Sequence, residues 1–234
     1  MTVHGGDTLA ALRAESAANE IEALAKLIAG LEAVLPALEV SSRAGSEGAR
    51  RADEAVRGVA VIEDDEGKID IPDGSADESE RQVTEGVERL RVEIVASGTG
   101  AGPRPETAQV SRLETALDKL LALQMPGGGF GAPADADWER GSVIATVEAV
   151  RAAIAALACL ATAHAAAGEP GNGARGNAAC AVERAMAWLF AAWSEEGFGD
   201  HPGTPPRASS TSAALAALRD YASLRQNCIG RDEP

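Results

Sequence analysis

Aromatic side chains are scarce in this chain of 234 residues, which contains three phenylalanines, three tryptophans and one tyrosine. Apolar residues still make up 45% of the chain, enough for a core, although much of that fraction is alanine, which buries little area. Alanine, leucine, glutamate and arginine dominate, and these strong helix formers predict an all-α fold.

Cysteine and positive charge are also in short supply. Three cysteines without a Cys-x-x-Cys pair predict reduced thiols in a cytoplasmic protein rather than a disulfide framework. A net charge of −15 argues against nucleic acid or an anionic membrane as the main partner, because both require Lys and Arg. We see no signal peptide and no uninterrupted apolar run of the ~18 residues that a membrane span needs. These absences predict an acidic protein with no nucleic-acid partner and no membrane span.

The first part of the chain, residues 1–97, is predicted to be an acidic helical region. Apolar residues spaced three and four apart between Ile21 and Leu38 predict an amphipathic helix. Pro36 should kink this helix or end it just before the proline, because proline lacks the N–H that a helix interior needs. A further helix is expected over residues 77–96.

A small β-hairpin is expected near residues 59–72, with Gly67 in its turn. The overlapping segment 63–80 contains nine acidic residues and one base. Its acids lack the spacing of an EF-hand loop, so we interpret it as a solvated loop, with a cation or a basic partner as the alternative. Residues 98–106 are rich in glycine and proline and are the predicted linker between two domains.

Four helices are predicted in the second domain, residues 107–228. The first spans residues 107–124. The second begins with Ser142 as its N-cap and ends before a loop at residues 168–177, which the third helix follows. The fourth helix begins within residues 209–212.

A glycine-flanked phenylalanine follows the first and the third of these helices. Phe130 and Phe198 are 68 residues apart, and each is followed by a loop and a serine-containing helix start. This order repeats, and it aligns Ser142–Leu157 with Ser209–Leu218. The glycines allow positive φ where a helix stops, so each phenylalanine can fold back between the helix ends. We expect each ring to be a buried wedge at the junction of a helix pair; a substrate contact is the alternative.

At these residues the chain resembles the prenyltransferase and squalene-cyclase (terpene-cyclase) repeat family, over about residues 107–225. The resemblance rests on Gln124 and Gly127–Gly131 in the first copy and on Gly197–Gly199 in the second, each with the serine-started helix that follows. It implies an α/α toroid of repeated helix pairs around an apolar cavity, and an enzyme of isoprenoid metabolism. The chain has too few helices for a full ring, so the ring would be partial, closed by the N-terminal helices, or completed by a partner chain in an oligomer.

The same resemblance suggests where a catalytic site would lie. Class II cyclases use an aspartic acid of a D-x-D-D motif as the proton donor, and the closest stretch here is "DADW", in which Trp138 replaces the third acid. Asp135 and Asp137 are the candidate catalytic acids; solvated loop acids are the alternative. Candidate substrate-binding residues are Phe130, Trp138, Trp193, Phe198, Asp200, His201 and Arg207.

Cofactors are not indicated by a motif. Protein prenyltransferases hold zinc with an Asp, a Cys and a His, and no matching pattern is present, so zinc is not expected. Magnesium would be needed only if a diphosphate is bound. Two functions remain open. One is a terpene-cyclase or prenyltransferase relative acting on an isoprenoid. The other is a non-catalytic accessory or binding protein that keeps the repeat scaffold and binds an apolar small molecule or a protein partner.

Overall fold

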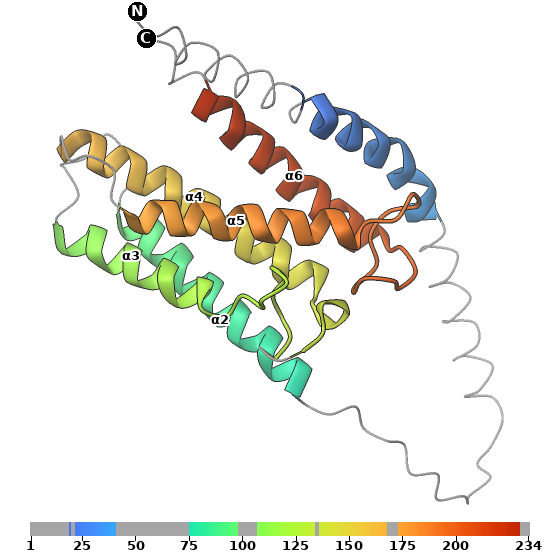
Figure 1. The fold of residues 1–234 in the computed structure, drawn as a ribbon, viewed down its shortest axis with the longest axis horizontal. Helices are drawn as coiled ribbons and strands as arrows, with labels where there is room; N and C mark the ends of the chain where they lie inside the picture. Colours follow the sequence, from blue (N-terminus) through green and yellow to red (C-terminus); the bar gives the residue numbers. More distant parts are fainter. Residues whose placement is uncertain are drawn as a thin grey trace, which may run out of the picture.

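The computed structural model describes residues 19, 22–40, 75–97, 107–133, 136–167 and 173–229, and all regular structure within them is helical (Figure 1). The predicted all-α class is therefore confirmed for these residues. In chain order the elements are a helix over residues 22–40, α2 (Ser75–Ala96), α3 (Thr107–Leu121), the short 3-10 helix η1 (Trp138–Arg140), α4 (Val143–Ala167), α5 (Gly173–Ala192) and α6 (Ala208–Ile229).

Ser142 caps α4 as the sequence predicts. Its Oγ accepts a hydrogen bond from the N–H of Ala145 at 3.3 Å, and α4 ends at Ala167, just before the predicted loop. The loop expected over residues 168–177 is too long, because α5 already begins at Gly173. Glycine and asparagine favour a loop locally, but packing of the later turns of α5 holds the helix. The ends of α2, α3 and the start of α6 lie within three residues of their predicted positions.

The helix over residues 22–40 does not end at Pro36, so of the two predicted outcomes, a kink or an end, the end is excluded. It continues to Val40, and Leu35 and Leu38 on the two sides of the proline are partly buried. Pro36 itself is exposed, so the backbone carbonyl that it leaves without a partner can be hydrated. Packing on the far side of the proline thus outweighs the lost hydrogen bond.

This first helix lies alongside α6 (Figure 1). An ion pair between Glu32 and Arg219 joins the two helices. Leu24 and Leu31 are buried in the same apolar cluster as the C-terminal helices, and so are Val83 and Leu90 of α2. One continuous core therefore includes residues from both sides of the predicted linker. The linker and the predicted hairpin lie outside the described residues, and the division into two domains stays a prediction.

The central element is α4, which contacts α2, α3, α5 and α6. Alanine and valine dominate its buried positions, and these small side chains let neighbouring helices approach on several sides. Helices at equivalent places in the two predicted repeats also contact one another, α3 with α5 and α4 with α6. The two consecutive helix pairs are therefore in contact through α3–α5 and α4–α6, and α2 covers α3 and α4.

Length and composition alone would allow α4 to cross a membrane. Its most apolar 18-residue window has a mean hydropathy of 2.0, and 56% of that window is buried inside the protein. Glu148 and Arg151 interrupt the apolar run of this segment, so the sequence did not indicate a membrane span there. A core helix surrounded by other helices has the same composition. The expected lack of a membrane span therefore stays a prediction.

Replacing Leu31 with alanine tests whether the first helix is part of the core. Leu31 is 2% exposed, so Leu31→Ala should lower the free energy of unfolding by about 2–5 kcal/mol in a urea titration. Val40→Ala is the matched control on the same helix, because Val40 is 67% exposed and its loss should change stability by less than about 0.5 kcal/mol. Equal effects of the two substitutions would show that this helix does not pack as described.

Candidate functional site

The two glycine-phenylalanine turns are built with the same hydrogen bond. The backbone N–H of Phe130 donates to Oγ1 of Thr146 at 2.9 Å, and the N–H of Phe198 donates to Oγ1 of Thr211 at 3.0 Å. Both bonds are buried, where an unpaired N–H would be costly. Each threonine lies in the first turns of the helix that follows the loop. The hydrogen bond therefore joins the phenylalanine at the start of the loop to the helix at its end.

The carbonyl groups of the two phenylalanines are matched in the same way. The Phe130 oxygen accepts from the N–H of Ser142, and the Phe198 oxygen accepts from the N–H of Arg207, both at 2.8 Å. Arg207 is therefore the counterpart of Ser142, which corrects the predicted alignment of Ser142 with Ser209. The loop of the second turn is three residues shorter, and this difference hid the correct register in the sequence.

Both rings are buried, Phe130 at 1% and Phe198 at 0% exposure, which confirms the predicted wedge. The turns need their glycines. Gly128 has φ +101°, and a Cβ there would lie 2.4 Å from a backbone oxygen of α5. Gly197 has φ +125°, and a Cβ there would lie 2.7 Å from the threonine hydroxyl of its own turn. A side chain at either position is excluded by both space and conformation.

Gln124 ties the first turn to α5. Its Nε2 donates to the carbonyl oxygens of Gly128 at 2.9 Å and Ala181 at 2.8 Å, and its Oε1 accepts from Nη2 of Arg184 at 2.7 Å. This glutamine is part of the family resemblance. Its amide is fully engaged in contacts within the protein.

The second turn also caps the helix of the first repeat. The N–H of Val143, the first residue of α4, donates to the carbonyl oxygen of Asp200 at 2.9 Å. Nδ1 of His201 lies 3.1 Å from the carbonyl oxygen of Gly141, so an imidazole protonated at Nδ1 donates there. The loops of the two repeats thus meet at the N-terminal end of α4.

Three residues predicted as site residues come together in the second turn, but they bind one another or the backbone. The carboxylate of Asp200 pairs with the guanidinium of Arg207 and accepts a hydrogen bond from Oγ of Ser210 at 2.8 Å. Ser210 is fully buried. With His201 at the neighbouring carbonyl, these polar groups stabilise the loop.

The candidate acids lie in the first loop. Asp135 is outside the described residues. Asp137 is exposed and precedes η1, without a side-chain hydrogen bond to that helix. The carbonyl oxygen of Trp138 accepts from Nε1 of buried Trp188 at 3.1 Å, whereas the indole of Trp138 is 43% exposed. The described part of the loop therefore places neither an acid nor an aromatic ring in an enclosed apolar pocket.

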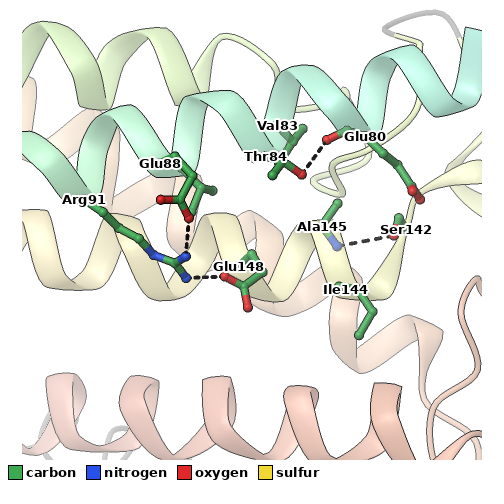
Figure 2. A pocket seen from close by; sticks show the side chains of 10 residues that line it. Glu80, Val83, Thr84, Glu88, Arg91, Ser142, Ile144, Ala145 and Glu148 are labelled. Atoms are coloured by element: carbon green, nitrogen blue, oxygen red, sulfur yellow. Dashed lines mark hydrogen bonds and ion pairs between the residues drawn. The ribbon is translucent and has the colours of Figure 1, made fainter.

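A hollow of about 380 Å³ lies between α2 and α4 (Figure 2). Val83 and Val87 of α2 and Ile144 and Ala145 of α4 provide its apolar surface. At one end are Glu80 and Ser142, and at the other is a cluster of three charged side chains, described next. This lining is mixed and open to solvent, unlike a closed isoprenoid cavity.

The charged cluster joins the two helices. Figure 2 shows Arg91 between Glu88 of its own helix and Glu148 of α4, and its guanidinium hydrogen-bonds to both. Desolvation opposes the charged form of Arg91, but the hydrogen bonds and charges of the two glutamates outweigh it and raise the pKa of Arg91 above its usual value. The guanidinium is thus occupied in holding α2 on α4.

A second hollow, of about 470 Å³, lies where α5 ends and the second turn begins. Trp193, Pro205 and Pro206 give it apolar surface, and Glu196 is its only charged lining residue. The Trp193 indole is 40% exposed. Of the predicted substrate-binding residues, Trp193 alone lines one of these two hollows.

Metal ligands do not converge in the part of the chain that the structure describes. No group of three His, Cys, Asp or Glu side chains there could hold a metal ion. Cys159 is half-buried and Cys180 is exposed on another helix, and both are free thiols. The side chain of Cys228 lies outside the described residues. That the protein binds no zinc stays a prediction.

Comparison with known proteins returns no match: no model of a protein family fits the chain, and no curated protein or solved structure is significantly similar to it.

Replacing Thr146 with valine tests the bond on which each turn is built. Thr146→Val keeps the volume but leaves the buried N–H of Phe130 without an acceptor, so stability should fall by about 1–3 kcal/mol. Thr146→Ser keeps the acceptor and should restore part of the loss. Thr162→Val is the control, because that threonine is exposed on the same helix and bonds only to a carbonyl one turn earlier. If both valine variants unfold at the same urea concentration, the hydrogen bond does not support the turn.

The two described cysteines should differ in reactivity. Burial raises the pKa of the Cys159 thiol, so less of it is thiolate at neutral pH, and the thiolate is the nucleophile. In iodoacetamide at pH 7 we expect Cys159 to react more slowly than exposed Cys180, by roughly tenfold. Peptide mass spectrometry measures both rates, and the rate at Cys159 should rise as the pH approaches its raised pKa. Protein unfolded in urea is the control, where the rates should converge; equal rates in the folded protein would contradict this assignment.

Proposed function

We propose that this chain is a non-catalytic accessory or binding protein that uses a helical repeat as its scaffold. The observation that carries the proposal is that the most distinctive residues of the repeat are buried or hydrogen-bonded within the protein. Phe130 and Phe198 are buried with both backbone groups bonded, and Gln124 is bonded at both ends of its amide. The features that resemble an enzyme family are explained by the needs of folding.

The candidate chemistry supports the same proposal. Asp137 is exposed to solvent, and no apolar pocket encloses its carboxyl group. Asp200 and Arg207 pair with each other, so neither is a free acid or a free anion-binding group. The hollow between α2 and α4 is lined by glutamates, which would repel a diphosphate.

The arrangement of the repeats also enters this proposal. We take these two helix pairs as a segment of an α/α toroid, because α3 contacts α5 and α4 contacts α6. The matched hydrogen bonds of the two turns support a duplicated unit, and this is the observation that favours the second candidate, an isoprenoid enzyme related to terpene cyclases and prenyltransferases. A fold alone does not carry an activity, so the second candidate depends on the chemistry of a site.

An activity assay separates the two candidates. The purified chain is incubated with polyprenyl diphosphates of several lengths and with squalene, with and without magnesium, beside an active terpene cyclase as the positive control. We expect no cyclised or transferred product by mass spectrometry, because no described acid lies in an apolar pocket. Product from the wild type that disappears in Asp135→Asn or Asp137→Asn would overturn the proposal and establish the enzyme.

A further inference from the structure

Two aromatic rings are exposed together at the end of α5. Phe190, in the last turn of α5, is 38% exposed, and Trp193, the first residue after that helix, is 40% exposed. The chain has only seven aromatic residues, so two exposed rings three residues apart are a large share of them. Exposed aromatic surface beside a hollow is typical of an interaction site.

The hollow beside Trp193 is lined by a negatively charged side chain. Its lining includes the carboxylate of Glu196, and it contains no Lys or Arg. Glu195 is exposed next to it in the chain, and neither glutamate pairs with a base among the described residues. The site thus combines an accessible indole face with an unpaired carboxylate, and this combination favours a cation.

An arginine side chain fits both groups. Its guanidinium is planar, so it can stack on an indole while its N–H groups donate to a carboxylate. A small ammonium ion would use the same two groups, but it would leave most of the 470 Å³ beside Pro205 and Pro206 unfilled. A peptide segment can fill this space, and exposed proline and aromatic surface is commonly used to bind extended peptides.

A second copy of this chain is a poor occupant. A two-fold contact through this face would bring Glu195 and Glu196 of both copies together, and each chain has a net charge of −15. The partner should instead be basic where it meets this face.

We propose that the hollow beside Trp193 binds an arginine-containing segment of a partner protein, with the guanidinium stacked on Trp193 and paired with Glu196. This inference rests on the proposed function and names the class of partner. It is independent of the activity assay, since a chain without turnover can still fail to bind the peptide.

The probe is the peptide acetyl-Gly-Pro-Arg-Pro-Gly-amide, compared with the same peptide carrying citrulline, the neutral isostere of arginine. NMR follows the three indole N–H signals, assigned with Trp138→Phe and Trp193→Phe variants. The arginine peptide should shift the Trp193 signal in a saturable way and leave the equally exposed Trp138 signal unchanged. The citrulline peptide should bind at least about threefold more weakly, because it loses the charge on which the cation–π contact and the ion pair depend.

Two glutamate variants provide the decisive pair. Glu196→Gln should weaken the arginine peptide by about threefold or more, whereas Glu195→Gln, with the same change in net charge beside the hollow, should weaken it by less than about twofold. Equal losses in the two variants would mean unspecific attraction by the acidic surface and would overturn the proposal. Equal binding of the citrulline peptide, or no shift of the Trp193 signal, would overturn it too.

Discussion

The hydrogen bond from a buried phenylalanine N–H to a threonine hydroxyl is the contact on which each repeat depends. A phenylalanine wedge can seal a helix junction only if its backbone enters the core with it, and a buried N–H must find an acceptor. Thr146 and Thr211 supply that acceptor from the next helix. The positive φ of the turn glycines and the burial of the rings belong to the same backbone path.

Sequence patterns predicted the helices and the buried rings because these follow from local periodicity and from the special conformations of glycine. They did not predict Thr146 and Thr211, since the loops between phenylalanine and threonine differ in length by three residues. Each of the two helix starts carries a threonine, four residues after Ser142 in one and four residues after Arg207 in the other. This common spacing was the sequence signal that could have identified the two threonines. The sequence also left open whether the first helix ends at Pro36 or continues with a kink, because its continuation depends on contacts far away in the sequence, such as the partly buried position of Leu38 beyond the proline.

The candidate site divides in the same way. Residue types near the turns pointed to Asp200, His201 and Arg207, and the structure does place these residues at one end of the helix pairs, where they satisfy one another and the backbone. The hollow between α2 and α4 is formed by residues about 60 positions apart in the sequence, such as Glu88 and Glu148. A local sequence pattern cannot predict a contact over such a separation. Trp193 was a candidate substrate-binding residue from the sequence, whereas Glu196 and the two prolines that folding places beside it were not.

The hydrogen bond from Val143 to Asp200 has a consequence for how the chain can be divided. The carbonyl oxygen of Asp200, in the loop of the second repeat, accepts the N–H of Val143 at the start of α4. The helix pair of the first repeat therefore does not itself contain the acceptor for this N–H. A fragment that stops before the second turn would expose an unpaired amide at the start of its most apolar helix. The two repeats also share one hydrophobic core, so we expect them to fold together rather than as separable units.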